Sequence, residues 1–291
     1  MERRKLHADG PECSRIVVGA WRWHQVSAEQ VEKLIRTSLD QGITSFDHAD
    51  IYGDHSNEER FGAVVRKQPS LRGQMQLITK CGIKFPSSKR PETRVKHYDT
   101  SAAHIRWSVE NSLQMLATDR IDVLLIHRPD PLMHGAELAE IFSTLRREGK
   151  VLHFGVSNFT PAQFRMLQSC LSFPLVTNQI EFSVGAISPM FDGTLDTLME
   201  FRVSPMAWSP LGGGKPLPAD ERVLFGLAAK HNCTYSQLAL AWLMQHPSGV
   251  FPVVGSTKTE RIEEAARAVT VQLERQDWFE LLKSVMGKEM P

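Results

Sequence analysis

Several polar side chains come directly after short apolar runs in the sequence. Lys80 follows residues 77–79, and an ammonium group at the end of an apolar strand is costly to bury without a partner. Asp47, which follows residues 43–46, is the obvious candidate partner. The other residues in this kind of position are His127, Ser157, Asn158, Gln179 and Ser209. Together they predict a ring of polar groups around one opening, where charged and hydrogen-bonding side chains can act on a bound molecule.

Each of these residues also has a purely structural interpretation. His127 alone is compatible with a buried histidine whose nitrogens are hydrogen-bonded. Asn158 and Gln179 are compatible with loop capping. Several such coincidences at one rim are much less expected than any one of them, so the set as a whole favours a functional site.

The elements that must position these residues alternate along the chain. Short β-branched runs are followed by stretches of helical periodicity, which is typical of βαβ units and a parallel sheet. Ser27 and Gln30 are spaced as a capping box, an apolar stripe follows them, and Gly42 ends the predicted helix. Similar start and stop signals recur at Ser101, Gly149, Thr160, Pro161 and Gln163.

The candidate strands have the number that a closed barrel with outer helices needs. They lie near Val17, Ile43, Leu77, Val123, Phe154, Val176, Met206 and Val253. No linker interrupts the pattern, so we predict a single-domain (β/α)8 TIM barrel, an α/β fold, over residues 1–291. An open doubly wound sheet is the alternative, but its usual G-x-G-x-x-G phosphate signature follows none of these strands.

Composition narrows the class of partner. The chain has 291 residues, 42% of them hydrophobic, which is ordinary for a globular protein. Its 34 basic and 33 acidic residues give a net charge of +1, so we expect a small-molecule partner and neither nucleic acid nor a membrane. We find no secretion signal and no apolar segment of the roughly 18 residues needed to span a bilayer, which favours the cytoplasm. The widely spaced cysteines are interpreted as reduced thiols outside any zinc site: Cys13, Cys81, Cys170 and Cys233.

Five motifs resemble those of the aldo-keto reductase family, in the family's order and across nearly the whole chain. They are residues 46–53 (FDHADIYG), 78–80 (ITK), 125–127 (LIH), 155–159 (GVSNF) and 208–212 (WSPLG). Residues 127–132 and 158–163 further resemble the YdhF-like bacterial branch of that family. The resemblance implies a reductase that passes hydride from NADP(H) to an aldehyde or ketone carbonyl, with the chain acting as a monomer.

The resemblance makes Tyr52 the proton donor. A tyrosine with an ordinary pKa of about 10 is a reluctant acid at neutral pH, so it needs a neighbour that favours the phenolate. A cationic Lys80 would do this, and Asp47 would keep Lys80 charged and oriented. His127 would donate a hydrogen bond to the carbonyl oxygen, and no metal is needed.

The resemblance also assigns the nicotinamide contacts. Ser157, Asn158 and Gln179 would bind the carboxamide of the ring. Trp208, which stands where many members carry tyrosine, would stack on the ring itself.

Two further segments are assigned to the phosphates. The glycine-rich loop would let backbone N–H groups approach the pyrophosphate; it includes Ser209, Pro210, Leu211, Gly212, Gly213 and Lys215. Ser256, Lys258 and Arg261 would lie near the adenosine phosphate and favour NADPH over NADH. The remaining cofactor residues implied are Gly19, Ala20, Trp21, Gly255, Thr257 and Glu264. A flexible turn and a solvated helix are the structural alternatives for these segments, and the family's common Lys and Asn are replaced by Gly255 and Ala265.

Other functions and the substrate class stay open. A sensor or auxiliary subunit with a bound nicotinamide nucleotide and little turnover fits the same fold, whereas a metal hydrolase lacks its H-E-x-x-H signature. Basic residues predominate in residues 82–100, which is compatible with an anionic or sugar-like carbonyl and equally with a solvated loop. Trp21 and Trp23 are expected either to line the substrate pocket or to pack against the rim.

Overall fold

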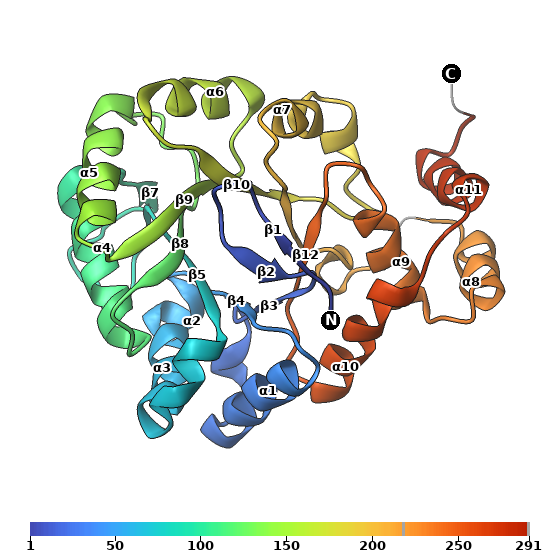
Figure 1. Ribbon diagram of the computed structural model, residues 1–291, viewed down its shortest axis with the longest axis horizontal. Helices are drawn as coiled ribbons and strands as arrows, with labels where there is room; N and C mark the ends of the chain where they lie inside the picture. Colours follow the sequence, from blue (N-terminus) through green and yellow to red (C-terminus); the bar gives the residue numbers. More distant parts are fainter. Residues whose placement is uncertain (217–218, 290–291) are drawn as a thin grey trace.

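The computed structural model describes residues 1–216 and 219–289, and at its centre these residues form a closed barrel of parallel strands (Figure 1). The strands are β3 (Val17–Gly19), β4 (Ser45–Asp47), β5 (Gln76–Cys81), β8 (Ile121–Ile126), β9 (Val151–Ser157), β10 (Leu175–Glu181), β11 (Met206–Trp208) and β12 (Phe251–Val254). Each pairs with the next along the chain, and β12 pairs with β3 to close the ring. The predicted (β/α)8 TIM barrel is confirmed, and the open doubly wound sheet is wrong.

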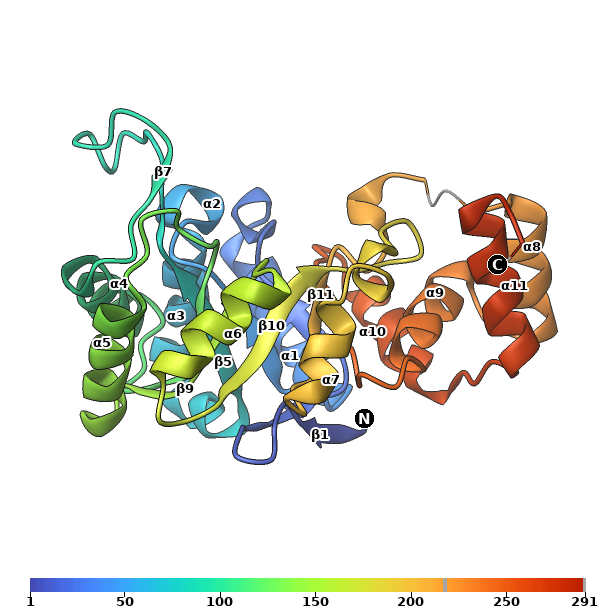
Figure 2. The ribbon, with the colours of Figure 1, turned by 90° about the horizontal axis from the view of Figure 1, so that it is seen from above.

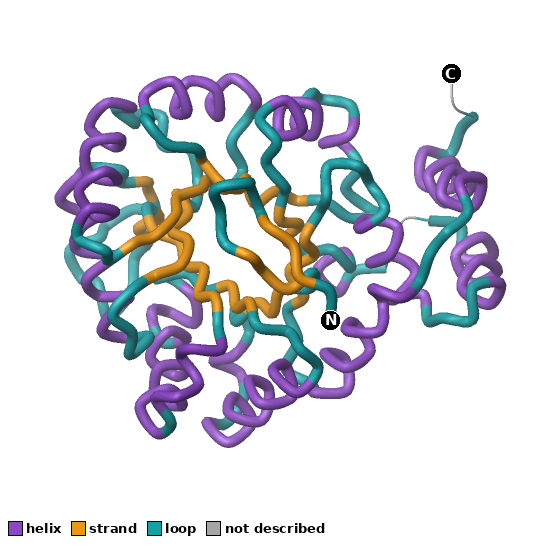
Figure 3. The backbone as a smooth tube through the Cα atoms, viewed as in Figure 1, coloured by secondary structure: helices purple, strands orange, loops and turns teal. Residues whose placement is uncertain are grey.

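Helices surround the strands on the outside, as the purple ring around the orange strands in Figure 3 shows. They are α1 (Ala28–Asp40), α2 (Tyr52–His55), α3 (Asn57–Lys67), α4 (Ala102–Met115), α5 (Gly135–Arg147), α6 (Pro161–Cys170), α7 (Thr194–Glu200), α8 (Glu221–Lys230), α9 (Tyr235–Met244), α10 (Thr259–Arg267) and α11 (Arg275–Met286). Short 3-10 helices cover Trp23–Gln25, Pro69–Gln74, Ser188–Met190, Gly212–Gly214 and Ala268–Thr270. None of the helices in these two described ranges is long and apolar enough to cross a membrane.

The predicted capping signals hold with one correction. Thr160 and Gln163 form a complete capping box at the start of α6. At α1, Ser27 accepts a hydrogen bond from the Gln30 backbone, but the Gln30 side chain donates to the Thr257 carbonyl instead of returning to Ser27. The Ser27 box is therefore only half formed, because a tertiary acceptor competes for the glutamine.

The core lies in two layers, one inside the barrel and one between the barrel and the helices. Every residue of β8 is buried, as expected for a parallel strand covered on both faces. The barrel interior is filled by Leu6, Cys13, Val17, Ile78, Val123, Leu125, Val176, Met206, Phe251 and Val253. Because side chains fill the interior, a small molecule can bind only at an end of the barrel.

Two short hairpins lie at opposite ends of the barrel (Figure 2). The first pairs β1 (Arg3–Lys5) with β2 (Glu12–Ser14) and covers the end at which the strands begin. The second pairs β6 (Ile83–Lys84) with β7 (His97–Tyr98) and carries a loop that projects from the other end. Polar site residues therefore share their end of the barrel with the β6–β7 loop.

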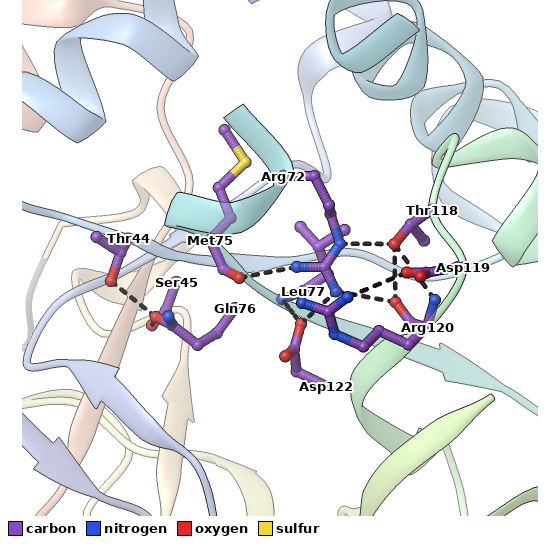
Figure 4. A network of polar contacts seen from close by, with 10 residues as sticks. All are labelled: Thr44, Ser45, Arg72, Met75, Gln76, Leu77, Thr118, Asp119, Arg120 and Asp122. Atoms are coloured by element: carbon purple, nitrogen blue, oxygen red, sulfur yellow. Dashed lines mark hydrogen bonds and ion pairs between the residues drawn. The ribbon is translucent and has the colours of Figure 1, made fainter. Parts of the chain in front are cut away.

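A polar network ties together the strand starts at the end opposite the site (Figure 4). The buried Arg72 guanidinium donates to Asp122, Thr118 and the carbonyls of Met75 and Arg120. Asp122 also accepts from the Leu77 backbone at 2.8 Å. The network links the loop before β5 to the start of β8, so it locks two neighbouring strands in register.

Candidate active site

A lysine at the centre of the site is completely buried and fully hydrogen-bonded. Lys80, on β5, has no exposed side-chain surface. Its Nζ atom donates to both carboxylate oxygens of Asp47 at 2.7 and 2.6 Å, and to the His48 carbonyl at 2.8 Å. It also lies 3.1 Å from the hydroxyl oxygen of Tyr52. The predicted pairing of Lys80 with Asp47 is present, and it holds the lysine against the tyrosine.

The electrostatics of this group follow from burial and from the ion pair. Burial lowers the pKa of Lys80, but the Asp47 carboxylate and the Tyr52 hydroxyl raise it by more, so the net pKa lies above its usual value. Burial raises the pKa of Tyr52, and the nearby Lys80 charge only partly offsets this. At neutral pH the site therefore contains an ammonium group beside a protonated phenol.

The turn that carries Tyr52 has an unusual backbone. Three consecutive residues after it, Gly53, Asp54 and His55, have φ values of 60°, 52° and 60°. A side chain at Gly53 would clash, since its Cβ would lie 2.2 Å from the amide oxygen of Asn57. Asn57 in turn donates to the carbonyls of Ala20 and Trp21. The turn is therefore tied to the loop after β3, and it fixes where Tyr52 begins α2.

His127 completes the group at the end of β8. Its ring lies 5.8 Å from that of Tyr52, at an interplanar angle of 78°. Burial, followed by the charges of Lys80 and Arg128, holds the pKa of His127 well below its usual value. The imidazole is therefore neutral at physiological pH, and a neutral ring carries one N–H that it can donate.

The residues predicted to contact the nicotinamide form one connected network. The Ser157 hydroxyl donates to the Gln179 carbonyl, and the Asn158 amide donates to the Ser157 hydroxyl, both at 2.8 Å. The Trp208 indole donates to the Asn158 side-chain oxygen at 2.9 Å. The Gln179 amide donates to Asp47 at 2.8 Å, a contact that the sequence did not indicate.

The glycine-rich loop after β11 has a left-handed backbone conformation at three consecutive residues. Gly212, Gly213 and Gly214 all have positive φ, between 67° and 94°. The Arg22 guanidinium donates to the Gly213 carbonyl at 2.8 Å, which joins this loop to the one after β3. Lys215 is exposed beside them. Glycines in this conformation leave backbone N–H groups open to an anion.

The second predicted phosphate segment lies at the start of α10. Lys258 and Arg261 are exposed there, while the buried Ser256 hydroxyl accepts from the Lys258 backbone at 3.0 Å. Since β12 pairs with β3, Gly255 lies beside Gly19. Glu264 accepts a hydrogen bond from Thr234. The remaining predicted residues border these loops: Ala20, Trp21, Ser209, Pro210, Leu211 and Thr257.

The two tryptophans after β3 separate in the structure. Trp21 is 56% exposed, whereas Trp23 is completely buried. The Trp23 ring stacks on Phe61 at 6.1 Å, and its indole donates to the Ser256 carbonyl. Trp23 therefore packs in the core and does not line the substrate pocket.

Two buried carboxyl groups next to the site were missed by the sequence analysis. Glu58 accepts from Thr79 at 2.6 Å and from Ser112 at 2.9 Å, and burial raises its pKa to about 7. Asp50 accepts from Ser108 at 2.7 Å, and burial raises its pKa to about 8. In the sequence Glu58 looks like a surface charge in the first turn of a helix, so nothing there indicates its burial.

Comparison with known proteins gives one consistent result. Residues 15–285 match the model of the aldo/keto reductase family. The chain is 45% identical over 300 residues to the oxidoreductase YdhF of Escherichia coli, covering all of both chains. It is 44% identical over 297 residues to a 6-dehydroglucose reductase of Agrobacterium fabrum, again covering both chains fully. A crystal structure of a thermostable aldo-keto reductase superposes with a TM-score of 0.85 at 25% identity, covering 97% of this chain and 99% of the other.

Proposed function

The chain belongs to the aldo/keto reductase family, in agreement with its YdhF-like motifs, and from this membership and the site geometry we propose that it is a single-domain, NADPH-dependent reductase of aldehydes and ketones. The observation that carries the proposal is the buried Lys80, held between the Asp47 carboxylate and the Tyr52 hydroxyl. An ammonium group beside a phenol stabilises the phenolate, so this arrangement supports a reaction in which Tyr52 gives up its proton.

Tyr52 is the proposed acid. Lys80 donates a hydrogen bond to the phenol oxygen, so the phenol proton is free to point toward a substrate. As that proton moves to the carbonyl oxygen, the negative charge that develops on the phenolate is stabilised by the adjacent ammonium group. Asp47 keeps Lys80 charged throughout, because it balances the buried cation.

His127 is proposed to orient and polarise the carbonyl group. A neutral imidazole beside the Tyr52 ring donates one hydrogen bond without adding a positive charge that would compete with Lys80. Two donors, the phenol and the imidazole, would then converge on one carbonyl oxygen.

The side chains and loops around the site fit a nicotinamide nucleotide. When bound, NADPH supplies the hydride for the carbonyl carbon. We propose that Ser157, Asn158 and Gln179 hold the carboxamide of the ring, with Trp208 against its face. The left-handed glycines fit the pyrophosphate, because a Cβ atom would obstruct the approach of an anion to the backbone. The remaining cofactor positions are Gly19, Ala20, Trp21, Ser209, Pro210, Leu211, Lys215, Gly255, Thr257 and Glu264.

Preference for NADPH is proposed from the start of α10. Lys258 and Arg261 are exposed at the N-terminus of α10. The helix dipole makes this end favourable for an anion. A phosphate on the adenosine ribose would add two negative charges at this position, which NADH lacks. The basic pair therefore supports NADPH.

The test is NADPH oxidation by the purified chain with a panel of aldehydes, ketones and quinones. Sugar aldehydes belong in the panel because the Agrobacterium relative is called a 6-dehydroglucose reductase. We expect turnover that falls by at least roughly a hundredfold in Tyr52→Phe, which keeps the ring but removes the proton. If NADPH binds and no substrate is reduced faster than by the variant, the proposal fails and the sensor or auxiliary-subunit function replaces it.

A further inference from the structure

Arg128 directly follows His127 just after β8, and the proposed reaction gives it no role. Its guanidinium carbon lies 5.8 Å from the centre of the Trp208 ring, at the end of β11. Strands β9 and β10 separate β8 from β11 in the barrel. A side chain that starts after β8 and reaches the end of β11 therefore extends over the mouth of the barrel, where a substrate must enter.

The charge of Arg128 acts on both residues that would contact the carbonyl oxygen. Burial lowers the pKa of His127 most, and three cations lower it further: Lys80, Arg128 and Lys96. Every charged group among these causes is therefore positive. Burial raises the pKa of Tyr52, which is also shifted by the Lys80–Asp47 pair and, in the downward direction, by Arg128. These effects agree with a guanidinium placed beside the reacting groups.

The guanidinium of Arg128 is open and has no counter-charge. Within residues 1–216 and 219–289 it lies against the Trp208 ring and forms no ion pair or hydrogen bond. Arg128 is half-buried, but its nitrogens are not among the fully enclosed polar atoms that lack a partner, so a bound molecule can reach them. A partly desolvated cation without a counter-charge favours the binding of an anion.

The acidic residues nearest to this segment do not neutralise the guanidinium. Asp130 accepts hydrogen bonds from the Leu132 backbone and from the backbone and hydroxyl of Thr100. Glu181 ends β10 and is exposed. In the described part of the chain neither carboxylate lies within ion-pair distance of Arg128. The positive charge over the mouth is therefore available to a ligand.

The chemistry of arginine defines the group that would be bound. Its planar fork of N–H donors matches the two oxygens of a carboxylate, which it binds through two parallel hydrogen bonds. Lys96, which is exposed on the β6–β7 loop, supplies a second positive charge whose effect reaches His127. Both features favour a negatively charged substrate over a neutral one.

We propose that the substrate is an oxo acid, a carbonyl compound that also bears a carboxylate, and that Arg128 binds this carboxylate while Tyr52 and His127 contact the carbonyl oxygen. The inference rests on the proposed reductase function and deepens it by naming the substrate class. Of the two substrate classes compatible with the basic residues 82–100, it selects the anionic one.

The test compares molecules that differ only in charge. The meta and para isomers of carboxybenzaldehyde carry an aldehyde and a carboxylate on one ring, and their methyl esters lack the charge. The first readout is the ratio of kcat/KM for each acid to that for its ester, with NADPH. The second is calorimetric titration of the NADPH-saturated chain with the corresponding alcohols, the hydroxymethylbenzoates and their methyl esters. Because an alcohol cannot be reduced, this titration measures binding without turnover.

Three variants separate charge from geometry. Arg128→Gln removes the charge and keeps an amide donor, whereas Arg128→Lys keeps the charge without the planar fork. Arg94→Gln is the matched control, because it removes the same charge from an exposed position on the β6–β7 loop. In Arg128→Gln the acid-to-ester ratio, and the affinity for the hydroxymethylbenzoates, should fall at least roughly tenfold. Arg128→Lys should give an intermediate ratio, and Arg94→Gln should change it by less than about twofold.

Wild-type ratios near unity, or no binding of either hydroxymethylbenzoate, would overturn the proposal. Equal losses for acid and ester in Arg128→Gln would also overturn it, because they would give Arg128 a structural role. An equally large loss of NADPH affinity would assign Arg128 to the cofactor instead. If no carbonyl compound is reduced, the reductase function fails, but the alcohol titration still decides whether Arg128 selects an anion.

Discussion

A lysine buried as completely as Lys80 needs a counter-charge, and Asp47 supplies both of its carboxylate oxygens. The same pairing keeps the ammonium within 3.1 Å of the Tyr52 hydroxyl. Burial raises the pKa of the Tyr52 phenol above its usual value, so Tyr52 stays protonated throughout the physiological pH range. The acid strength of Tyr52 therefore depends on Asp47 through Lys80.

Asp47→Asn is expected to lower kcat by roughly a hundredfold or more at neutral pH, because the uncompensated Lys80 loses charge and no longer stabilises the phenolate. The measurement is the pH profile of kcat with the best carbonyl substrate. Asp54→Asn is the matched control, since Asp54 lies in the same turn but is exposed. Equal activity of both variants would contradict the role given to Asp47.

Glu58→Gln is expected to stabilise the protein at alkaline pH. Burial raises the pKa of Glu58 to about 7, so the unfolded chain releases its proton first and stability declines as the pH rises from about 4.5 to 7. Glutamine keeps partners for Thr79 and Ser112 but does not ionise. The stability gap in favour of the variant should grow by on the order of 2–3 kcal/mol between pH 4.5 and 8.5 in urea unfolding. A gap that is constant with pH would show that Glu58 does not titrate in this range.

For single residues, the sequence predicted contacts best where burying a charged group without a partner would be strongly unfavourable. Lys80 after an apolar run requires a partner, and Asp47 was recognised from that requirement alone. Glu58 was not, because a glutamate in a first helical turn is usually solvated. Trp23 was ambiguous for the opposite reason: an indole is equally suited to a pocket wall and to a core, and only the packing against Phe61 decides.

At the level of elements, the helix starts were predictable because they depend on local hydrogen bonds. The capping box at Thr160 formed as its spacing predicts, whereas Gln30 found a tertiary acceptor that no local pattern reveals. The hairpins β1–β2 and β6–β7 were missed because their strands are only two or three residues long. Such strands show no apolar alternation.

The start of α10 gives a prediction about the cofactor. Lys258→Ala should raise KM for NADPH roughly tenfold and leave KM for NADH unchanged, because the side chain would contact only the additional phosphate. Arg267→Ala, in the last turn of the same helix, is the control and should change neither constant. An equal rise in KM for both nucleotides would assign Lys258 to the pyrophosphate instead.

In the whole molecule, chemistry and stabilisation occupy opposite ends of the barrel. The site residues follow the strands, while the Arg72 network lies where the strands begin (Figure 4). The strand pattern predicted the polar residues at the end where the strands stop, but it did not predict the Arg72 network at the other end.

Asp122→Asn is expected to destabilise the protein by about 3 kcal/mol, because it leaves the buried Arg72 guanidinium without its counter-charge. The variant should keep the kcat and KM of the wild type at a temperature where it is folded. Asp119→Asn, whose side chain is 81% exposed, should change the free energy of unfolding by less than about 0.5 kcal/mol. A loss of kcat in folded Asp122→Asn would show that the two ends are coupled.

The ring closes where β12 pairs with β3, joining Val253 to Val17. During synthesis the first barrel strand therefore emerges long before its last neighbour, and a growing chain that stops short of Phe251 leaves β3 and β11 with unpaired edges. These unpaired strand edges can form hydrogen bonds with strands of other nascent chains. The yield of folded protein is therefore expected to depend on how fast the chain is completed as well as on its final stability.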